Sequence, residues 1–136
     1  VLFRSEELME FTVAHRRKYN IEHIWFQEKE EVLTVGISDF LAQDIGDVLR
    51  VILPQAEDEL DKGDEMFSLW TAEGKQTFRS PFAGTITEVN GEVEINPDLV
   101  NESPYDLGWM IIVQPHEFDV EDLLDPDEYV DTLAEA

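Results

Sequence analysis

The sequence contains no cysteine and only three histidines in 136 residues. The absence of cysteine excludes disulfide bonds, thiolate zinc sites and a cysteine nucleophile. His15, His23 and His116 are too far apart in the sequence for metal-ligand spacing, so we expect surface or packing roles for them. The signatures of serine hydrolases, phosphate loops and dinucleotide sites are also missing, so the sequence predicts no active site of its own.

Positive charge is scarce as well. Nine Lys and Arg residues stand against 32 Asp and Glu residues, for a net charge of −23. This balance argues against nucleic acid and anionic membranes as direct ligands, because both attract basic surfaces. No apolar run is long enough to span a membrane, and no apolar segment follows a basic start. We therefore expect a single cytoplasmic domain.

The few basic residues lie in the first part of the chain. Residues 80–136 contain no Lys or Arg but fifteen Asp and Glu residues. Two interpretations stay open at this point. The acidic half is either a solubilising surface or a surface that attracts a basic partner over a long range.

From Tyr19 onward, glycines and prolines separate short apolar runs that are rich in β-branched and aromatic residues. This spacing predicts a mainly β fold, either a sandwich or a barrel of short strands. The expected strands span 32–37, 47–53, 65–71, 76–80, 83–89 and 108–113. The residues expected in the core are Trp25, Val35, Ile37, Val48, Val51, Ile86, Trp109 and Ile111.

Two helices are predicted from their capping residues. Ser38 is placed to cap a short helix over 39–45, which Gly46 ends. A second helix begins at Asp125-Pro126, with Glu128 at the third helical position. This arrangement is typical of a capping box, so we expect a helix at the C-terminus.

Three further predictions concern short segments with one or two indicative residues each. Asn90-Gly91 indicates a turn, and Asn96-Pro97 indicates the start of a helical turn. Ser5 is placed to begin a short helix that reaches Phe11. We treat residues 1–17 as an N-terminal extension, flexible or docked.

The runs over 65–71 and 76–80 flank Ala72-Glu73-Gly74-Lys75 and predict a hairpin. We expect Ala72, Glu73 and Gly74 at a solvent-exposed tip, with Gly74 at positive φ. A side chain at such a tip is accessible to an enzyme that modifies it.

Several motifs occur in a fixed order along most of the chain. They are Lys18-Tyr19-x-x-Glu22-His23-x-Trp25, Val35-Gly36-Ile37-Ser38-Asp39-Phe40, Ile45-Gly46-Asp47-Val48, Leu53-Pro54, Ser80-Pro81-Phe82-Ala83-Gly84, Glu88-Val89-Asn90, Asn96-Pro97-x-Leu99-Val100-Asn101-Glu102-Ser103-Pro104-Tyr105-x-x-Gly108-Trp109, and Leu124-Asp125 with Tyr129. In this order and spacing the sequence resembles the H-protein family of the glycine cleavage system, over residues 18–134. The segment 101–109 is the most specific match.

The resemblance implies a lipoyl/biotinyl-type flattened barrel or sandwich, a barrel-sandwich hybrid, in residues 18–136. Members of that family carry lipoate on a hairpin lysine and do no chemistry themselves. They ferry an aminomethyl group between a pyridoxal-phosphate decarboxylase, a tetrahydrofolate-dependent aminomethyltransferase and a dihydrolipoyl dehydrogenase. The partners implied are these enzymes, other lipoate-dependent enzymes and lipoate ligase, and we expect a monomer that acts as carrier or scaffold.

Two positions depart from the family pattern. The family places its lipoyl-lysine eight residues before the proline of Ser-Pro-x-x-Gly, and that position here, counted from Pro81, is Glu73. Lys75 stands two residues later. The family also has a glutamate between the His and Trp of its first motif, near the loaded arm, where this chain has Ile24. An isoleucine side chain accepts no hydrogen bond and balances no cation.

These departures leave two functional interpretations. The leading one is a paralogue that keeps the scaffold and lacks the usual lipoyl attachment lysine. The alternative is a working carrier that is lipoylated on Lys75, because two positions along a strand restore the same face and a bulge shifts a hairpin's register. Against the alternative, a slip of two residues moves the lysine by roughly 6–7 Å along the strand.

Overall fold

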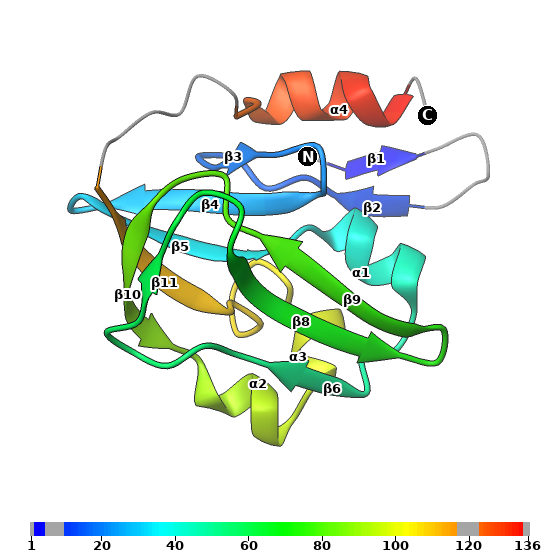
Figure 1. Ribbon diagram of the computed structural model, residues 1–136. Coiled ribbons are helices and arrows are strands. Elements are labelled where there is room, and N and C mark those ends of the chain that lie inside the picture. Colours follow the sequence, from blue (N-terminus) through cyan, green and yellow to red (C-terminus); the bar gives the residue numbers. More distant parts are fainter. Residues whose placement is uncertain (1, 5–9, 117–122, 135–136) are drawn as a thin grey trace.

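Two antiparallel sheets, built from strands that lie far apart in the sequence, enclose most of the core (Figure 1). They are seen in a computed structural model that describes residues 2–4, 10–116 and 123–134. The larger sheet has six strands in the order β3-β4-β5-β11-β10-β7. Its strands are β3 (Lys18–Tyr19), β4 (Ile24–Lys29), β5 (Val32–Ile37), β11 (Ile111–Pro115), β10 (Gly84–Val89) and β7 (Glu59–Leu60).

The smaller sheet has three strands in the order β6-β8-β9. Its strands are β6 (Arg50–Ile52), β8 (Glu65–Thr71) and β9 (Gly74–Arg79), and a separate pair is formed by β1 (Leu2–Arg4) and β2 (Glu10–Thr12). The helices are α1 (Asp39–Ile45), α2 (Gly91–Ile95), α3 (Asp98–Glu102) and α4 (Pro126–Ala134). The prediction of a mainly β sandwich with short helices and a C-terminal helix is therefore confirmed.

The main core lies between the two sheets. It is built from inward-facing aliphatic and aromatic side chains of both sheets, among them Phe26, Leu69 and Val113. Seven of the eight side chains predicted to be buried are at most 3% exposed: Trp25, Val35, Ile37, Val48, Val51, Ile86 and Ile111.

Trp109 is the exception, because it is only partly buried. It packs against a second apolar cluster, which lies beneath α4 and contains Tyr19, Trp25 and Tyr129. The indole of Trp25 lies over Gly36, where an added Cβ would approach the ring to 2.7 Å. Glycine at position 36 therefore makes room for a large buried aromatic side chain.

Both predicted helix starts are confirmed. The Ser38 side chain accepts a hydrogen bond from the backbone N–H of Leu41 and so caps α1. At α4, the Glu128 carboxylate accepts a hydrogen bond of 3.1 Å from the backbone N–H of Asp125. This is the reciprocal half of a capping box, which satisfies a backbone donor that the helix itself leaves free.

Some predicted bounds are wrong, for reasons visible in the hydrogen bonds. The strand expected over 108–113 begins at Ile111, because the N–H of Gly108 is turned back to the carbonyl of Ser103 at 2.8 Å. The strand expected over 47–53 shortens to β6, and the N–H of Val48 donates to the Asn101 side chain instead. Strands β9 and β10 differ from their predicted bounds by one or two residues at their ends.

The turn predicted at Asn90-Gly91 is wrong. Gly91 begins α2, and the Asn90 side chain accepts a hydrogen bond from the backbone N–H of Glu92. Asparagine is as favourable at a helix N-cap as in a turn, so the pattern did not separate the two. At the next predicted helical turn, α3 follows Pro97 directly, which confirms that turn.

The helix predicted from Ser5 to Phe11 is wrong where it can be checked. Glu10–Thr12 is strand β2, and it pairs antiparallel with β1. Residues 5–9 lie outside the described part of the chain. The division between an extension over 1–17 and a domain over 18–136 stays a prediction.

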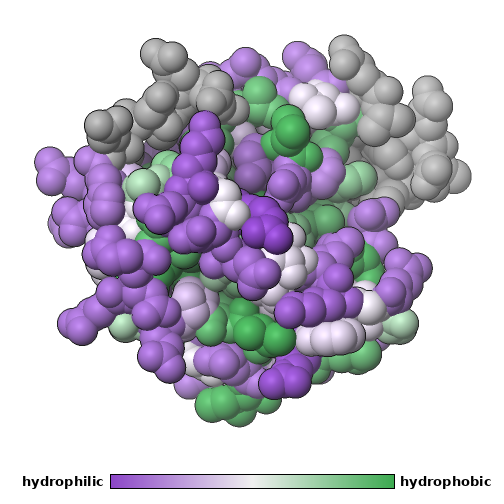
Figure 2. All heavy atoms as spheres, in the orientation of Figure 1, coloured by the Kyte–Doolittle hydropathy of each residue, from purple (hydrophilic) through white to green (hydrophobic). Residues whose placement is uncertain are grey.

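Hydrophilic side chains cover most of the face shown in Figure 2, with small apolar patches between them. Five large apolar side chains are exposed on the described surface: Ile21, Leu49, Trp70, Ile95 and Leu107. Of the helices that the structure describes, none is both long and apolar enough to span a membrane.

Candidate functional site

The hairpin of β8 and β9 projects from the smaller sheet and ends in a two-residue turn (Figure 1). Thr71 and Gly74 form its last cross-strand pair, so Ala72 and Glu73 make the turn. Gly74 has φ of 121°, which an L side chain rarely adopts. The backbone N–H of Glu73 donates to the Thr71 hydroxyl at 3.2 Å, which helps to hold the turn. The predicted tip is confirmed for the exposed Ala72 and Glu73 and for the positive φ of Gly74, whereas Gly74 itself belongs to β9 and is only partly exposed.

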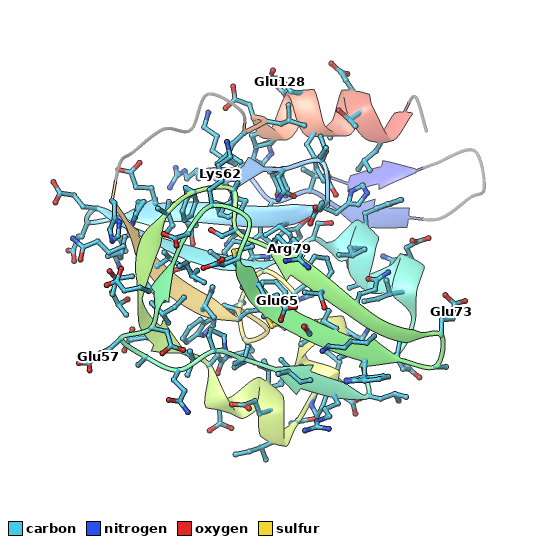
Figure 3. The ribbon with its side chains drawn as sticks, in the orientation of Figure 1. Glu57, Lys62, Glu65, Glu73, Arg79 and Glu128 are labelled. Atoms are coloured by element: carbon cyan, nitrogen blue, oxygen red, sulfur yellow. The ribbon has the colours of Figure 1, made fainter. Side chains whose placement is uncertain are left out.

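Figure 3 shows Glu73 at the outer end of this hairpin, with its side chain directed away from the sheets. A carboxylate in this position is accessible to another protein, but it has no amine. The amide that attaches lipoate needs an amine, so residue 73 cannot carry that group. The turn is exposed, and neither of its two residues carries an amine.

Lys75 lies in a different setting from Glu73. It belongs to strand β9, where it is exposed and stands directly opposite Trp70 of β8. Trp70 in turn stands opposite Arg50 of β6. Cross-strand partners project from the same face of a sheet. The amine of Lys75 therefore belongs to a row of Arg50, Trp70 and Lys75 on the sheet surface and not to the turn.

Ile24 is a core residue in the structure. It pairs with Ile37 across β4 and β5, and it is completely buried in the main apolar cluster. A carboxylate at this position would lose its hydration without gaining a partner from these apolar neighbours. Residue 24 therefore supplies no acidic group to any arm.

The three histidines are far apart in the fold as well. His23 bonds to Tyr129, His116 lies near Glu59 at 3.2 Å, and His15 is exposed. Within the described ranges, no group of three His, Asp or Glu side chains is placed to hold a metal ion.

A largely buried hydrogen-bond chain joins the turn before β4, the N-cap of α1 and α4, and it was not foreseen from the sequence. The Tyr129 hydroxyl lies 2.8 Å from His23 Nδ1 and 2.8 Å from Ser38 Oγ. Burial lowers the pKa of His23, an effect that the nearby Asp44 opposes, and burial raises the pKa of Tyr129. Neutral groups therefore make this chain, and the pairing over 106 residues left no local signal in the sequence.

Comparisons with known proteins agree with this architecture. A family model described as "Glycine cleavage H-protein" matches residues 17–136. The chain is 37% identical over 119 residues to a glycine cleavage system H protein of Staphylococcus epidermidis, covering 87% of this chain and 94% of that protein. It is 36% identical over 119 residues to one of Halalkalibacterium halodurans, covering 87% and 93%. A crystal structure of a glycine cleavage system H protein from Mycobacterium marinum superposes with a TM-score of 0.81 at 25% identity, covering 88% of this chain and 98% of that one.

Proposed function

Because the chain belongs to the glycine cleavage H-protein family, whose members are lipoyl carriers without an active site of their own, we propose that it is a non-catalytic paralogue that lacks the usual lipoyl attachment lysine. It keeps the sandwich and the projecting hairpin of a carrier. In place of the attached group it presents a carboxylate. Its role would then lie in binding the partners of the family rather than in carrying an intermediate between them.

The single observation that carries this proposal is the place of Glu73. Counting back from Pro81 puts Glu73 where the family has its lysine, and the structure puts the same residue in the two-residue turn. The sequence count and the geometry of the turn select the same position. The hairpin can therefore be matched to the family pattern without inserting or deleting a residue.

Lys75 supports the alternative function, a carrier that is lipoylated at that residue. Its amine is exposed and next to the tip. However, it lies on a regular strand two residues beyond the turn, opposite Trp70. A ligase that holds the tip in its site would meet Glu73 first, with the Lys75 amine displaced along β9.

Intact mass spectrometry separates the two functions. The wild-type protein, Lys75→Arg and Glu73→Lys are each incubated with a lipoate ligase, lipoate and ATP, beside the Staphylococcus epidermidis relative as a positive control. We expect no adduct on the wild type or Lys75→Arg, and an adduct on Glu73→Lys, where an amine returns to the turn. Because residue 73 is exposed, this substitution leaves the fold intact.

A lipoyl adduct on the wild type that disappears in Lys75→Arg would overturn the proposal and establish the carrier function. Absence of an adduct on Glu73→Lys, with the control protein modified, would show that the turn is not the recognised position, and it would also contradict the proposal.

The proposed partners are the enzymes with which the family works, other lipoate-dependent enzymes, and lipoate ligase. The acidic residues 80–136 offer a surface to which a basic partner would be attracted. We propose that the protein acts as a monomer in the cytoplasm.

A further inference from the structure

A hollow of about 340 Å³ lies on the outer face of the main sheet, away from the β8–β9 hairpin. Its floor is a row of three side chains that stand directly opposite one another on adjacent strands: Gln27 of β4, Thr34 of β5 and Ile112 of β11. All three are partly exposed. The row offers an amide, a hydroxyl and one apolar contact to whatever enters the hollow.

One wall of the hollow is an arginine that lies against two neighbouring aromatic rings, whose centres are 6.2 Å apart. The guanidinium of Arg17 lies 4.7 Å from the centre of the Trp25 ring and 5.1 Å from that of Tyr105. It also donates a hydrogen bond of 3.1 Å to the carbonyl of Tyr105. Stacking and hydrogen bonding fix the plane of the guanidinium before any ligand arrives, so little entropy is lost when it binds.

The Trp25 ring is itself fixed. Its indole N–H donates to the carbonyl of Pro104 at 2.9 Å, and its face rests over Gly36. Trp109 also lines the hollow as a further aromatic side chain. The walls therefore combine aromatic rings that are held in place with the polar groups of Arg17 and Asp106.

A carboxylate shares the hollow with the arginine, yet the two are not paired. Asp106 lines the rim and is exposed. Among the described residues, the ion pairs within 4 Å join Lys18 with Asp125 and His116 with Glu59. Burial lowers the pKa of Arg17, and the nearby Asp106 opposes that shift. A cation and an anion thus face one cavity with a gap between them.

From this arrangement we infer that the hollow binds a small zwitterion with one carboxylate and one ammonium group, such as a free α-amino acid. Its carboxylate would bind to Arg17 in the geometry that a planar guanidinium offers. Its ammonium would lie against Asp106 and the aromatic walls. The short separation of the two charges in an α-amino acid suits a cation and an anion that line the same small cavity.

The charge of the whole protein favours a zwitterion over a ligand that carries only a carboxylate or only an ammonium group. A simple carboxylate is repelled by a molecule of net charge −23. A simple ammonium is attracted everywhere on the acidic surface and is not directed to this hollow. A zwitterion has no net charge, so the overall field neither repels it nor attracts it to the rest of the surface. Its binding then depends on Arg17 and Asp106 in the hollow. The volume of the hollow, about 340 Å³, is at the lower end for ligand pockets and suits a small molecule.

Nuclear magnetic resonance of the tryptophan indole N–H groups tests this site, because the chain has three tryptophans. Trp25 and Trp109 line the hollow, and Trp70 on the smaller sheet is an internal control. The probes are L-alanine, propionate, which is alanine without its ammonium group, and ethylamine, which is alanine without its carboxylate. We expect L-alanine to shift the signals of Trp25 and Trp109 to saturation and to leave Trp70 unchanged. Propionate and ethylamine should give no saturation in the same concentration range.

Two variants complete the test. Asp106→Asn keeps the size of an exposed side chain, and Arg17→Lys keeps the charge without the planar fork. Each should weaken L-alanine binding by about tenfold or more, as expected for a hydrogen-bonded charge. The inference is overturned if L-alanine gives no saturable shift at Trp25 and Trp109, if Trp70 shifts equally, or if Asp106→Asn binds as the wild type does. It does not depend on whether the hairpin is lipoylated, since the hollow and the signals of Trp25 and Trp109 lie away from that hairpin.

Discussion

The ring of Tyr19 lies flat on the ring of Tyr129, with their centroids 4.3 Å apart and their planes within 1° of parallel. Tyr19 belongs to β3 and Tyr129 to α4, and both are fully buried. Close by, the backbone of Tyr19 exchanges two hydrogen bonds with Leu124, at 2.8 and 2.6 Å. The C-terminal helix is thus attached to the main sheet by aromatic stacking and by backbone pairing.

Substitution of Tyr129 should separate the contributions of its ring and its hydroxyl. Tyr129→Ala removes the stacked ring and should lower the free energy of unfolding by about 3–5 kcal/mol. Tyr129→Phe keeps the ring but leaves His23 and Ser38 without the hydroxyl, which should cost about 1–3 kcal/mol. Urea unfolding measures both. Equal effects of the two substitutions would contradict the role assigned to stacking.

The stability should fall with decreasing pH through the titration of His23. Burial lowers the pKa of His23 below its ordinary value of 6.5, so the unfolded chain takes up this proton at a higher pH than the folded chain does. The contribution of neutral His23 is therefore present above pH 6.5 and is lost as the pH falls from there toward the lowered native pKa. Once the ring is protonated, Nδ1 is a donor only, so the Tyr129 hydroxyl can no longer donate to it.

Urea unfolding of the wild type and His23→Gln across this pH range measures the effect. The variant should show a smaller pH dependence near pH 6 than the wild type, because residue 23 no longer titrates. His15→Gln, also at an exposed position, is the control for the substitution itself. A wild type and His23→Gln with identical pH profiles would refute the assignment.

The hairpin turn should be sensitive to a side chain at Gly74. Gly74→Ala places a Cβ on a residue with φ of 121°, and we expect a loss of about 1–3 kcal/mol in the free energy of unfolding. Gly91→Ala is the control, because Gly91 begins a helix and has nothing within 4 Å of an added Cβ. That change should be neutral or slightly stabilising. If both substitutions changed the free energy of unfolding by the same small amount, the backbone at Gly74 would not require glycine.

Asn101 should be important for stability although it is only partly buried. Its side-chain amide donates to the carbonyls of Ala42 and Gly46 at the end of α1, at 3.1 and 2.8 Å. Its side-chain oxygen accepts from the N–H of Val48 at 2.8 Å. Asn101→Ala removes all three bonds and leaves the partly buried groups of Ala42 and Val48 without this partner, so we expect the free energy of unfolding to fall by about 2–4 kcal/mol.

Asn101→Asp provides a sharper comparison. It keeps an acceptor for Val48, but it loses both donors and places a negative charge beside the C-terminal carbonyls of α1, which carry partial negative charge. We expect it to be at least as destabilising as alanine at neutral pH. If the aspartate variant were as stable as the wild type, the bonds to Ala42 and Gly46 would contribute nothing.

The segments whose structure was predicted well are those specified by local rules. Ser38 caps α1, Glu128 closes the box at α4, and Gly74 supplies the positive φ of the hairpin turn. Each of these depends on residues a few positions apart. The family motifs added the sandwich itself, and the strand pattern placed most of the core.

The failures arise where distant residues decide the outcome. Asn90 was assigned to a turn, but its side-chain amide donates to the carbonyls of Leu107 and Trp109, which fix it as the cap of α2. The motif that contains Asn101 was identified from its sequence alone, but the hydrogen bonds of Asn101 to α1 can be seen only in the structure. The stack of Arg17 on Tyr105 spans 88 residues and left no mark in the local sequence.

The order of strands in the main sheet also has a consequence for folding kinetics. Val35 of β5 pairs with Ile111 of β11, so the centre of this sheet joins segments far apart in the chain, and closing such a long loop slows folding. The β8–β9 hairpin closes over two residues and forms independently of that step. The rate of folding should therefore be insensitive to which side chain stands at position 73. Changes of chemistry at the tip can accumulate over evolution without impairing the assembly of the sheet that supports it.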